Sequence, residues 1–196
     1  MKNIILVTIF FLLSVSSFSQ KRDSVLVDRG IFTVMYSETL EQPLWVKYSI
    51  KNPKQIVSRR GLDFYTEGSY HTSDSKDYDD NVWDKGHLAP AAHFSNNREE
   101  LLKTFTYLNC GLQHNRLNRG VWRVLESNER IWSRTERLDV EVRVKFSSKS
   151  VKLPTGVVVP DGYYKTIRFE SGKVMCFYFP NKASTKKWNE YQIECK

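Results

Sequence analysis

The C-terminal third of the chain carries the pattern that most constrains its fold. Between Leu138 and Phe146, apolar and charged residues alternate strictly, which is typical of a strand with one buried face. Three more segments rich in β-branched and aromatic residues follow over 156–159, 163–169 and 173–179, with turn residues between them. Strands joined by such short connections pair antiparallel. The sequence therefore predicts an antiparallel sheet in this region.

The preceding residues predict one more strand and two helices. Leu44 to Ile50 has the aromatic and β-branched composition of a strand. The polar run Ser95 to Asn97 can cap a helix over 98–105, and a second helix is predicted from about Leu117 to Arg134. These elements favour the α+β class, with a central antiparallel sheet flanked by helices.

The N-terminus reads as a targeting segment. The apolar run from Ile4 to Val15 is shorter than the roughly 20 residues that cross a bilayer, and small residues follow it. We expect a signal peptide over 1–19 and one domain over 20–196, secreted or periplasmic, without stable membrane association after cleavage. An uncleaved N-terminal anchor is the alternative.

Charge and cysteine content narrow the possible partners and crosslinks. The chain has 30 Lys and Arg against 22 Asp and Glu, a formal charge of +8, which suggests an anionic partner such as nucleic acid. An exported protein can form disulfides, and its three cysteines allow three pairings. The C-terminal location of both Cys176 and Cys195 favours that pair over one with Cys110.

The densest group of chemically useful residues surrounds His87, in the run WDKGHLAPA. Gly86 is expected to allow a tight turn, and Pro90 excludes a helix, so His87 lies on a strand or turn. A histidine titrates near neutrality and can take a proton from water. The alternative is an ordinary surface histidine beside Asp84 and Lys85.

A second polar group falls on the predicted helix 117–134. Asn118, Trp122, Glu126 and Arg130 are spaced four apart and would form one stripe, beside an apolar stripe of Val121, Val124, Leu125, Ile131 and Trp132. The amide, carboxylate and guanidinium of this polar stripe would suit the binding of a hard cation and a phosphate. The alternative is an ordinary Glu126–Arg130 pair, with Asn118 as a helix cap.

Helix geometry limits how this stripe could bind a metal. Asn118 and Glu126 would lie about 12 Å apart along a straight helix axis. Asn118 would therefore bind an ion directly and Glu126 through water, which suits Mg²⁺ because that ion keeps several of its waters.

Together these segments resemble a known family. The runs WDKGHLAPAAHF and TFTYLNCGLQHNRLNRGVWRVLE are similar to the DNA/RNA non-specific endonucleases, whose signature is Asp-Arg-Gly-His, then Asn-x-x-x-Gln, then Asn-x-x-x-Trp-x-x-x-Glu. Matching positions here are Asp84, Gly86 and His87, then Asn109 and Gln113, then Asn118, Trp122 and Glu126. Weaker similarities extend the resemblance over about 43–181.

The resemblance implies a ββα-metal fold and a hydrolytic mechanism. His87 would be the general base that activates water, and a divalent ion, Mg²⁺ or Mn²⁺, would lie on Asn118 and stabilise charge on the phosphate. Glu126 would contact the ion through water, and Asn109 would help to fix the site. The substrates would be DNA and RNA, held by phosphate contacts without sequence specificity.

Cationic side chains are expected to hold the phosphate. The resemblance assigns this role to Arg130, to Lys85, which replaces the arginine of the signature, and to Arg60. Arg116 and Arg119 could also follow a nucleic-acid backbone, although solvated surface is the alternative for such arginines.

Several departures from the family pattern bear on activity. Besides Lys85, His93 stands where the family commonly has a carboxylate, Leu112 replaces a proline, and the chain stops at Lys196, short of the family's usual extent. A catalytically degraded nucleic-acid-binding protein of the same fold is therefore an alternative function. A binding module for another anionic polymer would explain the charge but not the ordered motifs. The sequence leaves open whether the protein is a homodimer.

Overall fold

The computed structural model describes residues 23–195, so the predicted signal peptide over 1–19 lies outside the described residues. Seven strands form an antiparallel sheet in the order β1-β2-β3-β6-β7-β8-β9, and β4 and β5 form a separate hairpin. The strands of the large sheet are β1 (Val25–Asp28), β2 (Phe32–Ser37), β3 (Gln42–Ile50), β6 (Leu138–Lys145), β7 (Gly162–Phe169), β8 (Val174–Pro180) and β9 (Gln192–Ile193).

Helical segments are short apart from one. The α-helices are α1 (Arg98–Lys103), α2 (Asn115–Leu117) and α3 (Arg123–Trp132), and a π-helical segment (Asn118–Trp122) joins the last two. Single 3-10 turns cover Ser75–Tyr78, Ala91–His93, Tyr107–Asn109 and Trp188–Tyr191. No helix within residues 23–195 has the length and hydrophobicity needed to cross a bilayer. The α+β class with an antiparallel sheet is thus confirmed, with α3 as its one longer helix.

Most of the predicted strands are present. The predictions over 44–50, 138–146, 163–169 and 173–179 correspond to β3, β6, β7 and β8. The prediction of a strand over 156–159 is wrong, since only an isolated bridge joins Lys152 and Val158. There Val158 donates its N–H to Leu40 O at 3.0 Å instead of joining a ladder. The structure adds β1 and β2, for which the sequence pattern gave no prediction.

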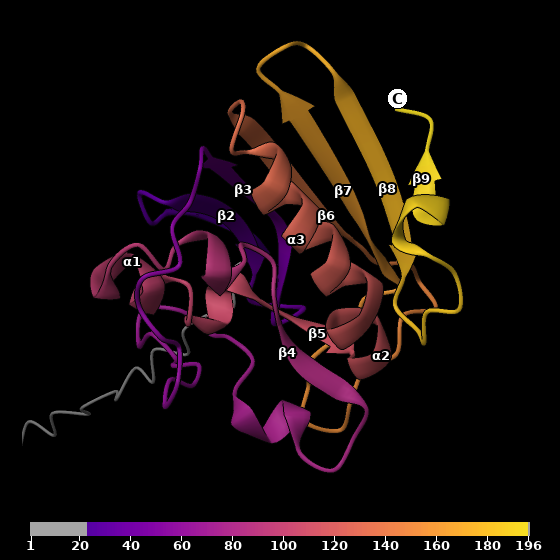
Figure 1. Cartoon of the computed structure of the whole chain (residues 1–196). Helices are drawn as coiled ribbons and strands as arrows, with labels where there is room; N and C mark the ends of the chain where they lie inside the picture. The colour runs from indigo at the N-terminus through magenta and orange to yellow at the C-terminus, as the bar shows by residue number, and fades with distance from the viewer. Residues whose placement is uncertain (1–22, 196) are drawn as a thin grey trace, which may run out of the picture.

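The core lies between the sheet and α3, which crosses one face of the sheet in Figure 1. Trp122, just before α3, is fully buried, and its ring centroid lies 5.6 Å from that of Tyr163 and 5.5 Å from that of Phe179. Leu125 is buried one turn later. Aromatic and aliphatic residues of alternating strand positions complete this layer: Val34, Val46, Val140, Val142, Ile167 and Phe177.

The predicted continuous helix over 117–134 is interrupted. Gly120 has non-helical dihedrals, φ −95° and ψ −118°. The side chains after it therefore project in directions that an unbroken helix from Leu117 would not give. The polar stripe and the apolar stripe predicted from an unbroken helix are therefore partly wrong. Trp122 is buried rather than polar-facing, whereas Val124 and Ile131 are 38% and 52% exposed. The 12 Å separation expected along a straight helix does not apply either.

The disulfide joins Cys176 on β8 to Cys195, which confirms the pairing favoured by the sequence. Cys110 is free and buried, and its Sγ lies 3.1 Å from the Tyr78 hydroxyl. Burial raises the pKa of the Cys110 thiol well above its ordinary value. This thiol is therefore protonated and inaccessible at neutral pH.

A group of buried polar side chains surrounds Glu129 at the centre of this interface. The Glu129 carboxylate accepts hydrogen bonds from the Tyr48 hydroxyl at 2.7 Å and from His93 Nε2 at 2.9 Å. Lys165 Nζ lies 2.6 Å from its other oxygen and forms an ion pair with it. Glu129, His93 and Lys165 side chains have no exposed surface. The group ties α3 to β3, to β7 and to the 3-10 turn Ala91–His93, which lies between β4 and β5 in the chain.

The charge on Glu129 depends on these partners. Burial tends to raise the pKa of Glu129, but Lys165 and His93 oppose it and lower the pKa to about 2. Because this pKa lies below the ordinary value of 4.5, ionised Glu129 stabilises the fold. Its contribution is complete above pH 4.5 and is lost as the pH falls through about 2.

We predict that Glu129→Gln lowers the free energy of unfolding by about 3–5 kcal/mol at pH 7, because it leaves Lys165 charged and buried without a counter-ion. Urea denaturation followed by tryptophan fluorescence measures this change. The control is Glu99→Gln, which removes an exposed Glu99–Lys103 pair and should cost less than about 1 kcal/mol. In Glu129→Gln, the free energy of unfolding should also lose the part of its pH dependence that comes from ionisation of Glu129. Equal stability of the two variants would contradict the prediction.

Candidate active site

The β4–β5 hairpin presents the residues around His87. β4 (Trp83–His87) pairs antiparallel with β5 (Cys110–His114), so His87 lies opposite Cys110 and Gly86 opposite Gly111. A Cβ atom on Gly86 would lie 2.6 Å from Gln113 Oε1 and 2.7 Å from Gln113 Cβ. Gly86 therefore permits the close approach of Gln113 within a strand, which corrects the predicted tight turn.

Asn109 fixes the backbone that follows His87. Its side-chain oxygen accepts from Ala89 N–H at 2.7 Å, and its amide nitrogen donates to Ala89 O at 2.9 Å and to Thr104 O at 3.0 Å. The residue is fully buried and does not line the pocket described below. Its position supports the expected role of holding the site in place, without direct contact with a substrate.

A hollow of about 620 Å³ lies where the hairpin faces the π-helical segment and α3, which are neighbours in Figure 1. It brings together six residues singled out from the sequence: Lys85, His87, Asn118, Arg119, Glu126 and Arg130. Arg60 and Arg116 do not line it. Arg59 does, as do Asp63, Asp84 and Arg123, which the site prediction did not include.

The His87 ring is held by two aromatic side chains. Its centroid lies 4.4 Å from that of Phe64 and 4.7 Å from that of Phe105. The residue is 8% exposed, and its buried Nε2 has no hydrogen-bond partner among the described residues. Burial, with a smaller effect of Arg59, lowers the pKa of His87 to about 3. The imidazole is therefore neutral at pH 7 and offers a lone pair to a proton donor in the pocket.

Asp84 organises the start of the helical segment. Asn118 donates its amide N–H to Asp84 Oδ2 at 3.0 Å. Arg119 forms a two-bond contact with the same carboxylate at 2.8 and 2.5 Å, and this contact raises the pKa of Arg119. Because the Asn118 nitrogen is committed to Asp84, its oxygen is the atom that could bind a cation.

Lys85 is paired within the protein. Its Nζ donates to both Asp63 oxygens at 2.9 Å and lies 5.8 Å from the centroid of the Tyr107 ring. Burial lowers the pKa of Lys85, but the contacts with Asp63 and Tyr107 outweigh it and raise the pKa. Lys85 therefore stays charged, but a phosphate would have to compete with Asp63 for it.

Glu126 and Arg130 occupy the α3 side of the pocket. Burial raises the pKa of Glu126 to about 7, although the nearby Lys165 opposes this rise. Arg130 donates from Nη2 to Ser127 Oγ at 2.9 Å, and its Nη1 lies 3.4 Å from His93 Nδ1. The α3 wall thus combines a carboxyl group that titrates near neutrality with an oriented guanidinium.

The donor atoms suit a hard divalent cation with few protein ligands. Within residues 23–195, no three His, Cys, Asp or Glu side chains gather in a way that could hold a metal ion. The pocket instead offers the oxygens of the Asn118 amide and of the Asp84 and Glu126 carboxyls. Mg²⁺ prefers oxygen ligands and retains several of its waters, so this set fits it.

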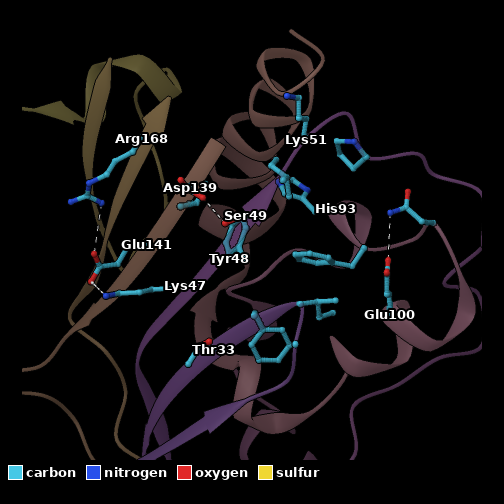
Figure 2. Close-up of a pocket in the computed structure, with 18 of the residues that line it drawn as sticks. Thr33, Lys47, Tyr48, Ser49, Lys51, His93, Glu100, Asp139, Glu141 and Arg168 are labelled. Carbon is cyan, nitrogen blue, oxygen red and sulfur yellow. Dashed lines mark hydrogen bonds and ion pairs between the residues drawn. The ribbon is translucent and has the colours of Figure 1, made fainter. Parts of the chain in front are cut away.

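A larger hollow of about 870 Å³ lies at the end of the sheet near β2, β3 and β6. Figure 2 shows Lys47 and Arg168 turned toward Glu141 there, with both N–O distances at 3.9 Å. None of the residues in the sequence-based site prediction lines this hollow. The smaller pocket around His87 is therefore the better candidate active site.

Glu129 is the one of these residues for which the sequence held a usable signal. Trp122, Leu125 and Glu129 are spaced as one face of a helix, so this spacing could have placed Glu129 in the core. Arg59 and Arg60 are adjacent, and only the path of the loop decides which of them reaches the pocket. The pairing of Asp63 with Lys85 joins residues 22 positions apart, and no local pattern indicates it.

Comparisons with known proteins agree on one family. The sequence profile of the DNA/RNA non-specific endonucleases matches residues 13–196. Mitochondrial endonuclease G from Bos taurus is 29% identical over 116 residues, which cover 56% of this chain and 38% of that protein. The enzyme from Homo sapiens shows the same identity over the same length, covering 39% of it. The chain thus matches well under two thirds of either relative.

The fold has a solved counterpart. A chain from the crystal structure of the EndoG/EndoGI complex superimposes with a TM-score of 0.74 and 21% sequence identity, covering 86% of this chain and 80% of that chain. At this level of identity the likeness concerns the fold alone.

We predict that Gly86→Ala lowers the free energy of unfolding by about 1–3 kcal/mol, because its Cβ would overlap the Gln113 side chain between two paired strands. The matched control is Gly68→Ala, where no atom lies within 4 Å of the added Cβ. Chemical denaturation of both variants measures the difference. Equal stability of the two would contradict the close-approach explanation.

Proposed function

This chain belongs to the DNA/RNA non-specific endonuclease family, and we propose that it is a metal-dependent endonuclease that hydrolyses the phosphodiester bonds of DNA and RNA without sequence specificity. One observation carries the proposal. A neutral His87 lines the same pocket as Asn118, Glu126 and several arginines.

In this mechanism His87 is the general base that takes a proton from the attacking water. A neutral imidazole carries a lone pair on one of its two ring nitrogens, and His87 lines the pocket in which the attacking water would lie. An imidazole with a pKa of about 3 would be a weak base, but a bound phosphate anion favours the protonated ring and raises that pKa. Phe64 and Phe105 hold the ring during the transfer.

Asn118 would hold the divalent ion directly, and Glu126 would contact it through water. When bound, Mg²⁺ or Mn²⁺ would act as a Lewis acid that stabilises negative charge on the scissile phosphate and the leaving oxygen. Asp84 keeps the Asn118 amide oriented. Glu126 is better suited to this role when ionised, above the pKa of about 7 that its burial imposes.

Substrate binding would depend on the charged rim of the pocket. Arg130 and Arg59 line it and can form charge-assisted hydrogen bonds with phosphate oxygens. Arg119 and Lys85 are also present but are paired with Asp84 and Asp63. Phosphate contacts carry no base information, so this mode of binding would be indifferent to sequence and sensitive to salt.

We further propose that the protein is secreted or periplasmic after removal of a signal peptide over 1–19. The apolar run Ile4 to Val15 and the disulfide between Cys176 and Cys195 support an oxidising compartment. Mass spectrometry of the exported protein tests this location. A mature N-terminus at Met1 would contradict it.

The first test of function is digestion of supercoiled plasmid and total RNA by the mature chain, with Mg²⁺ and with EDTA. We predict degradation of both substrates that EDTA abolishes. His87→Ala should lower the rate by about 10²–10⁴-fold, the usual contribution of a general base, and should leave binding of an oligonucleotide intact. The matched control is His71→Ala, which removes a histidine outside the pocket.

Two results would contradict this function. Cleavage by His87→Ala at the parent rate would show that His87 is not the general base. A folded protein that binds nucleic acid but does not cut it in the presence of any divalent ion would instead be a catalytically degraded binding protein. The pairing of Lys85 with Asp63 is the observation that would explain such a loss.

We also predict that Asp84→Ala raises the Mg²⁺ concentration needed for half-maximal cleavage by about 10–100-fold, the usual effect of removing a group that orients a metal ligand. The physical reason is that Asp84 accepts the hydrogen bond that orients the Asn118 amide. Titration of the cleavage rate with Mg²⁺ measures the change. Asp79→Ala removes an exposed carboxylate away from the pocket and should leave the titration unchanged.

A further inference from the structure

We propose that His93 is a positioning residue, which orients Arg130 toward the phosphate through its Nδ1 atom while Glu129 fixes its ring through Nε2. This inference rests on the proposed function, in which Arg130 binds the substrate phosphate. It gives a functional role to a histidine that is buried and takes no part in the reaction itself.

The geometry places His93 between two consecutive residues of α3. Glu129 and Arg130 point in directions about 100° apart because they are neighbours on a helix. Glu129 turns into the core, where its carboxylate lies 2.9 Å from His93 Nε2. Arg130 turns toward the pocket, and its Nη1 lies 3.4 Å from His93 Nδ1. One imidazole ring thus links the buried charge to the pocket wall.

Besides Glu129, parts of the chain outside α3 hold the His93 ring. His93 ends a 3-10 turn after Pro90, to which its backbone N–H donates at 2.9 Å. Its ring meets Tyr48 edge-on, with the centroids 5.7 Å apart, and Figure 2 shows the two side chains side by side. Its side chain has no exposed surface. Such a ring has little freedom to move with Arg130.

The partners also determine where the proton on His93 resides. An ionised Glu129 can only accept a hydrogen bond, so Nε2 carries the hydrogen. Arg130 can only donate, so the facing Nδ1 must hold a lone pair. Burial lowers the pKa of His93, and Lys165 and Arg130 add to this effect, although Glu129 opposes it. A neutral ring with hydrogen on Nε2 satisfies both neighbours.

Arg130 has a second contact that completes its orientation. Its Nη2 donates to Ser127 Oγ at 2.9 Å, on the same helix. Two contacts at different nitrogens fix the plane of a guanidinium, and that plane matters because arginine commonly binds phosphate through two directional hydrogen bonds. A displacement of about 1 Å in a reacting or charge-stabilising group can lower a rate about 10²-fold.

Two substitutions at the same residue separate the roles of the two ring nitrogens. Asparagine places an amide oxygen near the position of Nδ1, so His93→Asn keeps an acceptor for Arg130 and loses the donor to Glu129. Glutamine reaches the position of Nε2, so His93→Gln keeps the donor to Glu129 and loses the acceptor. A purely structural histidine would be replaced better by glutamine, and a positioning histidine better by asparagine.

The experiment measures kcat and KM for cleavage of a short oligonucleotide at saturating Mg²⁺, with the unfolding midpoint of each variant. We expect His93→Gln to lower kcat/KM about 10–100-fold with only a small change in midpoint. His93→Asn should keep kcat/KM within about fivefold of the parent while its midpoint falls further, because Glu129 loses a partner. In an Arg130→Ala background, His93→Gln should have no further effect on kcat/KM.

Binding of the same oligonucleotide in EDTA gives a readout that does not need cleavage. Arg130→Ala should reduce the slope of log affinity against log salt by about one, and His93→Gln should reproduce part of that loss. If the parent does not cleave but these binding effects appear, the proposed function fails and the positioning role stands. The inference is overturned if His93→Gln matches the parent in rate and binding, or if its effect adds fully to that of Arg130→Ala.

Discussion

The rest of the structure depends on one buried carboxylate. Glu129 lies where α3 meets the sheet, and its partners come from β3, from β7 and from the 3-10 turn between β4 and β5. A buried charge is stable only when its partners are in place, so these elements must assemble together. The same interaction fixes the rotation of α3, and that rotation decides which side chains face the pocket. The site therefore depends on a group that lies outside it.

The second constraint is the close packing within the β4–β5 hairpin. Gly86 lets Gln113 lie where a side chain would otherwise stand, and Asn109 holds both the Ala89 backbone and Thr104 O. His87 lies between the close packing at Gly86 and the backbone held by Asn109. Its ring is thus set by the hairpin, whereas Asn118 and Arg130 are carried by the helical segment. The two units are also joined across the pocket, because Asn118 donates to Asp84 on β4 and Arg130 Nη1 lies 3.4 Å from His93 Nδ1.

The sequence was sufficient for the elements whose pattern is local. The alternation over 138–146 predicted β6, and the ordered motifs predicted that His87, Asn118 and Glu126 would share one pocket. The sequence was insufficient where the backbone conformation of a single residue changes the directions in which the following side chains point. The dihedrals of Gly120 break the helix, so Trp122 moved from the predicted polar stripe into the core. Contacts between distant segments, such as Lys85 with Asp63, leave no periodic signal.

The buried and exposed charges of this region have different effects on the site. Lys165 lies in the core, where it counters Glu129 and also opposes the rise in the pKa of Glu126. Because water does not screen it there, one lysine can bias two carboxyl groups on successive turns of α3. The arginines at the rim are solvated and are better suited to exchange with substrate. Lys165 thus serves assembly, whereas the rim arginines are the ones that the proposed function assigns to phosphate, a division that net charge alone could not reveal.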